Sequence, residues 1–277
     1  MGASIAIWWT ALSVVFTLAW SSDAYTHIFL ILPLTAALIC TRQRPSVRSS
    51  LRRESWIGIV VLIAALLLRF ELEIWNLSAD EHLSCSMITL ILFWAGSLIE
   101  CFGIQALREL LFPFCFLALM IPFPAVALHR INSFLQDQSA WAASILFRAS
   151  RIPVARDGVL LSIPGLDIEI ASHCSSIRSS MFLFVITIFV GQLLLRSWWK
   201  KTLLIALSIP LSVAKNALRI FTIAELGTRV NPAFLDGWLH HKGGIIFFGL
   251  AICVTVLFTL ALRLSEPILL SNDARFS

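Results

Sequence analysis

Long apolar runs alternate with short polar stretches along nearly the whole chain. A helix that crosses about 30 Å of hydrocarbon needs about 20 predominantly apolar residues. By this measure the pattern predicts an all-α polytopic membrane protein with about eight transmembrane helices, in which residues 1–277 form a single integral-membrane domain. The predicted spans are Ile5–Trp20, Tyr25–Cys40, Trp56–Phe70, Cys85–Glu100, Leu110–Phe123, Ser175–Leu195, Leu203–Phe221 and Gly243–Leu262.

A long segment, residues 124–174, separates the fifth and sixth predicted spans. Residues Ile131–Arg151 repeat apolar positions with helical spacing, which predicts an amphipathic helix that lies in the membrane interface. Its apolar face is expected to consist of Ile131, Phe134, Leu135, Ala142, Ile145 and Leu146, with Asn132, Gln136, Asp137 and Arg148 facing away.

The second half of this segment changes to a period of two, because Leu166, Ile168 and Ile170 alternate with acidic residues. A turn signal, Pro164-Gly165, comes just before them. This pattern predicts a small β-hairpin that leads directly to Cys174.

Composition excludes a soluble or disordered protein, because 58% of the residues are hydrophobic and only 13% are charged, against about 25% charged in soluble domains. The net charge of +5 then reflects membrane topology, and no nucleic-acid partner is expected. Basic loops at residues 42–53 and 196–201 predict the cytoplasmic side. Residues 124–174 are then expected outside, and residues 263–277 form a short cytoplasmic tail.

Six cysteines are scattered along the chain without a CxxC pair. Most lie inside apolar runs, where cysteine acts as a small hydrophobic residue. Neither a zinc site nor a disulfide framework is therefore expected, and no metal or cofactor is predicted.

The first candidate chemical group lies in the stretch ASHCSSIRSS, residues 171–180, where the outer segment meets the sixth span. A thiol near a helix N-terminus gains thiolate character from the positive end of the helix dipole. Cys174 is therefore a candidate nucleophile, and Arg178 can add positive potential. The alternative is a buried structural cysteine.

The second group, Lys215, Asn216 and Arg219, lies in the outer half of the seventh span. Lys215 and Arg219 are four residues apart, so they share a helix face. Ionisable groups at membrane depth are costly and mark functional sites. The alternatives are that the two cations extend to lipid headgroups or pair with Glu225 or Glu169.

The third group is the pair His240 and His241, which precedes the eighth span beside Gly243 and Gly244. A histidine here can carry a proton near neutral pH. The alternative is an interfacial histidine pair that binds water or lipid.

Together the three groups supply a nucleophile, a cation and a titratable base at one membrane face, which favours nucleophilic acyl transfer. One alternative is a non-enzymatic transporter or assembly factor, although no repeated halves are seen. Another is a membrane acyltransferase that uses histidine without cysteine.

The chain resembles the exosortase/archaeosortase family, membrane enzymes of protein sorting that are similar to cysteine transpeptidases. The resemblance extends over most of the chain and is carried by the order and spacing of five motifs. These are YTHIFLILP (25–33), FLALMIPFP (116–124), IPVARDGVLLSIPGLDIEIASHCSSIRSS (152–180), NALRIF (216–221) and LHHKGGIIFF (239–248).

This resemblance implies a bacterial inner-membrane enzyme that needs no cofactor and whose active site faces outward. Its expected partners, besides the lipid bilayer, are membrane-anchored proteins with a C-terminal sorting signal. In the family this signal comprises a short Pro-Glu-Pro-like motif, a transmembrane helix and a basic tail. Cleavage near the motif is expected to be followed by hydrolysis or transpeptidation.

Carried over by motif, Cys174 is the nucleophile, Arg219 its electrostatic partner and His240 the proton carrier. His241 also satisfies the family's His-x-x-Gly motif. The resemblance adds two supporting candidates, Tyr25 and His27, from its Tyr-x-His signature, beside Lys215, Asn216 and Arg178.

The chain departs from the family pattern around the cysteine. His173 stands where a small residue is usual, and Ser176 stands where glycine is usual. His173 is therefore a further candidate to activate Cys174 or to act as the base.

Overall fold

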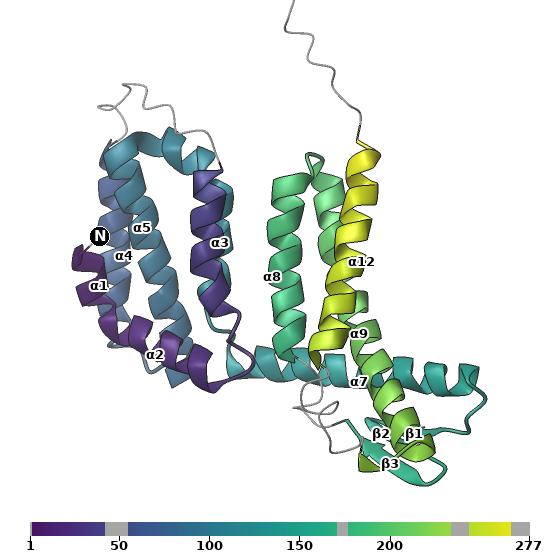
Figure 1. Cartoon of the computed structure of the whole chain (residues 1–277). Coiled ribbons are helices and arrows are strands. Elements are labelled where there is room, and N and C mark those ends of the chain that lie inside the picture. Colours follow the sequence, from purple (N-terminus) through teal and green to yellow (C-terminus); the bar gives the residue numbers. More distant parts are fainter. Residues whose placement is uncertain (1, 42–54, 171–176, 234–243, 267–277) are drawn as a thin grey trace, which may run out of the picture. The chain divides into compact units, whose positions relative to one another are not determined.

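The structure is a computed structural model that describes residues 2–41, 55–170, 177–233 and 244–266. The chain forms two compact units, residues 1–130 and 131–277. The described residues are mostly helical (Figure 1). The predicted single membrane domain is not tested by this division and stays a prediction.

The first unit is all-helical. Its best-defined helix start is that of α5, where Ser78 and Glu81 form a reciprocal capping box. Gly103, with φ 84°, interrupts α5. The elements are α1 (Gly2–Ile7), α2 (Trp9–Ser21), α3 (Ile28–Cys40), α4 (Ser55–Glu71), α5 (Ala79–Glu109), α6 (Leu111–Leu117) and the 3₁₀ turn η1 (Ala118–Met120).

Helices α4 and α5 pack closely because glycines lie at their crossing. A Cβ atom on Gly58 would lie 2.8 Å from the backbone nitrogen of Glu100, and one on Gly96 would lie 3.0 Å from that of Leu62. Small residues allow this backbone approach, which is how helices pack in membranes without a hydrophobic driving force between them.

The second unit combines a small sheet with long helices. Figure 1 shows α8, α9 and α12 side by side. Its elements are β1 (Ala155–Asp157), β2 (Leu160–Ile163), β3 (Leu166–Glu169), α8 (Ile177–Leu194), α9 (Trp198–Arg229) and α12 (Gly244–Leu264). Most of α7 (Ala125–Ala149) also belongs to this unit.

The sheet is antiparallel with the order β1-β2-β3. Two glycines with positive φ make its turns, Gly158 at 57° and Gly165 at 84°. Gly165 follows Pro164, the residue pair that a type II turn favours. The predicted β-hairpin is therefore real but incomplete, because the sequence pattern did not reveal β1.

The core of the second unit lies between the sheet, α7 and α9. Phe147 of α7 packs against Phe221 of α9, with ring centroids 5.1 Å apart. The buried members of this core are Ala140, Ala143, Phe147, Leu161, Ile163, Ile170, Ala217, Ile220 and Ala224. The half of α9 that follows Lys215 is thus fixed against the sheet that leads to the Cys174 segment.

The predicted amphipathic helix exists as α7. Its buried residues are Leu135, Phe147 and the small residues Ser139, Ala140, Ala143 and Ser144. Phe134, Trp141 and Ile145 are exposed, and Ala142 and Leu146 pack partly against the core. The small residues face protein because strands and α9 approach closely there, which leaves the large apolar side chains available to lipid.

Eight transmembrane helices are not confirmed. Among the described residues, four helices, α5, α8, α9 and α12, are long and apolar enough to cross a membrane. A fifth candidate is a pair of consecutive helices, Leu111–Met120 and Ala125–Ala149. Together they are long and apolar enough to cross, and they are bent by 88° at the break between them. Helices α2 and α3 have 13 residues each, or about 20 Å at 1.5 Å per residue, because the apolar runs that predicted them include turn residues.

Candidate functional site

The cationic group predicted in the seventh span lies near the middle of α9, within one continuous helix. Lys215 and Arg219 share a helix face, as their spacing predicts. Lys215 is 6% exposed, Asn216 is 1% exposed, and Arg219 is half-buried. A cluster of this polarity inside a helix bundle needs hydrogen-bonding partners from neighbouring elements.

Lys215 finds such a partner on α8. Its Nζ atom donates a hydrogen bond to Oγ of Ser179, in the first turn of that helix. The alternative in which Lys215 extends to lipid headgroups is therefore wrong. Of its proposed carboxylate partners, Glu169 is exposed and Glu225 pairs with Arg229 at 3.0 Å.

The first turn of α8 carries further polar groups. Ser180 is 7% exposed, and its hydroxyl has no hydrogen-bond partner among the residues that the structure describes. Arg178, the second residue of α8, is exposed. This turn follows residues 171–176 directly, so hydroxyl groups and cations lie next to the predicted nucleophile segment in the sequence.

The other side of that segment is held by α7. Nε2 of Gln136 donates to the carbonyl oxygen of Ile170 over 3.1 Å, and the amide of Ile170 donates to Val159 over 3.1 Å. Ile170 is 1% exposed, and a buried carbonyl without a partner costs about 1–3 kcal/mol. Gln136 supplies this partner where the ladder of β3 has ended.

A second bond ties the sheet to α7 one residue further along. The guanidinium of Arg156 in β1 pairs with the carboxylate of Asp137, and its Nε atom donates to the carbonyl of Gly158 over 2.8 Å. Gln136 and Asp137 were expected to lie away from the apolar face of the helix. Their polar atoms bind the sheet, and the Asp137 side chain stays 48% exposed.

Two helices of the second unit, α8 and α12, begin at the same end of the bundle that they form with α9. α8 and α12 both pack against α9, and in Figure 1 they run parallel to each other and antiparallel to α9. The starts of α8 and α12 therefore lie at the same end of this bundle. The predicted residues that precede them, His173, Cys174, His240 and His241, lie outside the described residues.

Tyr25 and His27 belong to a separate polar cluster in the first unit. Both are buried. The Tyr25 hydroxyl donates to the carbonyl of Phe123 over 3.0 Å, and Nδ1 of His27 lies 3.0 Å from the carbonyl of Ala24. Ser84 of α5 donates to the neighbouring carbonyl of Pro122 over 2.8 Å.

This cluster joins the YTH and IPFP motifs, which the sequence showed only as separate signatures. Its side chains bond to backbone carbonyls at turns, where the chain has no regular hydrogen bonds of its own. The arrangement is typical of side chains that stabilise turns by pairing with their backbone carbonyls. Ser84 was missed by sequence reasoning because a single serine in an apolar helix carries no distinguishing signal.

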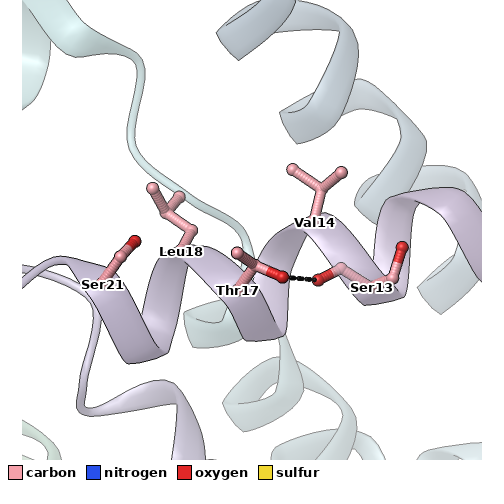
Figure 2. Close-up of a pocket in the computed structure, with 5 residues that line it drawn as sticks. All are labelled: Ser13, Val14, Thr17, Leu18 and Ser21. Atoms are coloured by element: carbon pink, nitrogen blue, oxygen red, sulfur yellow. Dashed lines mark hydrogen bonds between the residues drawn. The ribbon is translucent and has the colours of Figure 1, made fainter.

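A hollow of about 250 Å³ lies on α2 and is lined by five residues of that helix, Ser13, Val14, Thr17, Leu18 and Ser21 (Figure 2). Two of its hydroxyl groups bond within the helix, Ser13 to the carbonyl of Thr10 and Thr17 to that of Ser13. The hollow therefore offers little chemistry. In the part of the chain that the structure describes, no three His, Cys, Asp or Glu side chains gather as metal ligands.

Comparison with known proteins gives one match. The family model described as "Transmembrane exosortase" matches residues 19–257. The matched range includes every residue predicted for the site. No curated protein and no solved structure matches the chain.

Proposed function

The chain belongs to the transmembrane exosortase family, and from this premise we propose that it cleaves membrane-anchored proteins at a C-terminal sorting signal. The new C-terminus of the substrate is then released by hydrolysis or transferred to an acceptor amine. The proposed location is the bacterial inner membrane, with the chemistry at the outer face. One observation supports this most: a buried polar group around Lys215 and Asn216 meets the first turn of α8, just after the Cys174 segment.

The proposed reaction begins with the thiolate of Cys174. It attacks the carbonyl carbon of the scissile peptide bond, and a C–S bond forms as the carbonyl oxygen gains negative charge. Arg219 stabilises the thiolate or this oxyanion. The protonated imidazole of His240 gives its proton to the leaving amine as the C–N bond breaks.

A thioester on Cys174 remains after this step. Water or an acceptor amine attacks it, loses a proton to the now neutral imidazole, and restores the thiolate. His241 and His173 are the other candidates for the proton carrier. Lys215, Asn216 and Arg178 support the site through positive charge and hydrogen bonding, and the proposed steps need no metal or cofactor.

The test is processing of a membrane-anchored substrate in cells by cysteine variants of the full chain. Cys174→Ala is expected to abolish processing while the protein still inserts. Cys253→Ala is the matched control, since this exposed free cysteine on α12 is expected to be dispensable. Trapping a thioester between substrate and Cys174 would establish the intermediate directly.

Two results would separate the alternatives. Unprocessed substrate in wild-type cells as well as in variants would remove the enzyme function and favour a transporter or assembly factor. Full turnover by Cys174→Ala together with loss in a histidine variant would favour a histidine-dependent acyltransferase.

The proton carrier has its own test. If His240 carries the proton, the rate is expected to titrate between about pH 5 and 8. His240→Ala should remove this dependence and His241→Ala should retain it. A flat wild-type profile with chemistry rate-limiting would argue against an imidazole in this role.

A further inference from the structure

Basic residues gather at the end of the α8–α9–α12 bundle that lies away from the sheet (Figure 1). Glu266 joins the two segments that carry them, because its carboxylate accepts from the backbone amide of Arg196 over 3.0 Å. We call this group the basic end. Besides Glu266, its charged members are Arg196 before α9, Lys200 and Lys201 in the first turn of α9, and Arg263 in the last turn of α12.

Two cations of the basic end are already bonded within the bundle. Lys200 is 5% exposed and donates to the end of α12, and Lys201 donates to a side-chain amide oxygen on α8 over 2.8 Å. The side chains of Arg196 and Arg263 are exposed instead. Guanidinium groups carry forked N–H donors that match phosphate oxygens in pairs. The basic end therefore offers two exposed phosphate-binding groups to a ligand outside the bundle.

Large apolar side chains accompany these cations. In the first turn of α9, Trp198 is 78% exposed and Trp199 is 51% exposed, and at the end of α12 Leu264 is 86% exposed. Exposed indoles beside cations are typical of helix ends at the membrane–water interface, where the lipid headgroups lie. An acidic partner protein in water has no need of exposed indoles, so the combination favours a lipid surface.

The depth of the basic end agrees with this assignment. Helix α8 has 18 residues, or about 27 Å at 1.5 Å per residue, which is close to the roughly 30 Å of hydrocarbon in a bilayer. Arg196 follows just after the end of this helix. The basic end therefore lies about one bilayer thickness from the start of α8, on the side that the basic loops predict to be cytoplasmic.

We propose that the basic end is a binding surface for anionic phospholipid headgroups of the cytoplasmic leaflet. Arg196 and Arg263 pair with the phosphate groups, and the two indoles lie at the headgroup level. The occupant is anionic because, among the described residues, the basic end carries four cations against one carboxylate, and basic residues are attracted to an anionic membrane surface. This inference goes beyond the proposed function and does not depend on the reaction.

The test titrates lipids onto the full chain in detergent and derives each apparent Kd from the lipid-dependent rise in Tm. The probes are dioleoyl phosphatidylglycerol, which is anionic, and dioleoyl phosphatidylcholine, which has the same acyl chains and no net charge. Arg196→Gln/Arg263→Gln removes both exposed charges, and Arg196→Lys/Arg263→Lys keeps them. Arg229→Gln is the matched control, because Arg229 is an exposed arginine at the opposite end of α9.

The wild type is expected to bind phosphatidylglycerol more tightly than phosphatidylcholine. Arg196→Gln/Arg263→Gln should weaken phosphatidylglycerol binding about 30-fold, the loss expected for two cations near an anionic surface, and should leave phosphatidylcholine binding unchanged. The double lysine variant should keep most of the affinity, and Arg229→Gln should keep all of it. If the double glutamine variant does not fold, each single glutamine variant is expected to lose about fivefold.

Equal binding of the two lipids by the wild type would overturn the inference. An unchanged phosphatidylglycerol affinity in the glutamine variants, or an equal loss in Arg229→Gln, would also overturn it. Inorganic phosphate, compared with chloride at the same ionic strength, separates a lipid surface from a site for the free anion. A rise in Tm with phosphate as large as that with phosphatidylglycerol would assign the basic end to free phosphate and reject the lipid.

Discussion

Helix α9 carries two buried lysines with similar exposure, Lys200 at 5% and Lys215 at 6%, and the difference between their surroundings is informative. Lys200 lies in the first turn of α9 and meets the last turn of α12. Its Nζ atom donates to the carbonyl of Leu262 and to Oγ of Ser265, each over 2.9 Å. A cation at a helix C-terminus is favourable because carbonyls there lack partners.

The end of the bundle that holds Lys200 is a set of mutual helix caps. Glu266, just after α12, accepts from the backbone amides of Arg196 and Ser197 over 3.0 and 3.1 Å, next to the start of α9. Each helix end thus receives the charge that its dipole favours. These contacts between helix ends account for the burial of Lys200.

Lys215 has no such explanation. It lies in the middle of α9, its partner is a serine hydroxyl, and Arg219 stands on the same face. Two cations at this depth are costly, and a serine hydroxyl offsets less of that cost than a carboxylate. We therefore propose that Lys200 serves stability, whereas the cluster around Lys215 serves the proposed chemistry.

The largest effect is expected at Arg219. Arg219→Ala should lower the rate of substrate processing by about 10²–10³-fold, the loss typical of removing one group that stabilises an oxyanion. Arg229→Ala is the matched control in the same helix, since Arg229 is exposed and pairs with Glu225 at 3.0 Å. Equal activity losses in the two variants would remove the special role of Arg219.

Substitution of Lys215 should affect activity, whereas substitution of Lys200 should affect stability. Lys215→Met is expected to lower kcat about tenfold with little change in KM. Lys200→Met is expected to keep kcat and to lower the free energy of unfolding by about 1 kcal/mol, because it removes bonds to a helix end. Processing assays and denaturation in detergent measure the two effects, and an identical pattern in both variants would contradict the distinction.

Substitutions in the polar cluster around Tyr25 should lower stability with little effect on activity, as is expected for Lys200. Tyr25→Phe removes one hydrogen bond, to the carbonyl of Phe123, and is expected to lower the free energy of unfolding by about 1 kcal/mol. Residual processing should stay near the wild-type rate. A large loss of kcat in a stably inserted Tyr25→Phe protein would instead place this hydroxyl in the reaction.

The smallest effect concerns pH. Hydrogen bonds from the amides of Ser197 and Arg196 lower the pKa of Glu266 below its ordinary value. Its folded-state pKa is depressed, so its contribution to stability is present above the unfolded pKa near 4.5 and is lost as pH falls through the folded pKa. Thermal unfolding of Glu266→Gln should therefore be less sensitive to acid than that of the wild type. An unchanged acid dependence would contradict this contribution.

Some features of the site followed from the sequence because they depend on local spacing. The shared face of Lys215 and Arg219 follows from any continuous helix, and the Pro164-Gly165 turn follows from the conformations of those two residues. The family assignment, made from the order of five motifs, is confirmed by the family model. The roles of Cys174 and the histidines stay predictions.

Other features were out of reach of sequence reasoning. Strand β1 has only three residues, and its pairing with β2 depends on the approach of the two segments. Among the described residues, the structure also does not confirm eight helices long enough to cross a membrane, since apolar residues in turns and in helices look alike in a hydropathy pattern.

The sequence by itself determined that this chain belongs in a membrane and that its ionisable groups gather in a few segments, because solvation in lipid penalises each polar residue individually. Only the tertiary structure decided which partner each polar group takes. Gln136 reaches Ile170 and Lys215 reaches Ser179 because helices and strands distant in sequence pack together. Such contacts depend on three-dimensional approach, which hydropathy and spacing along one chain do not encode.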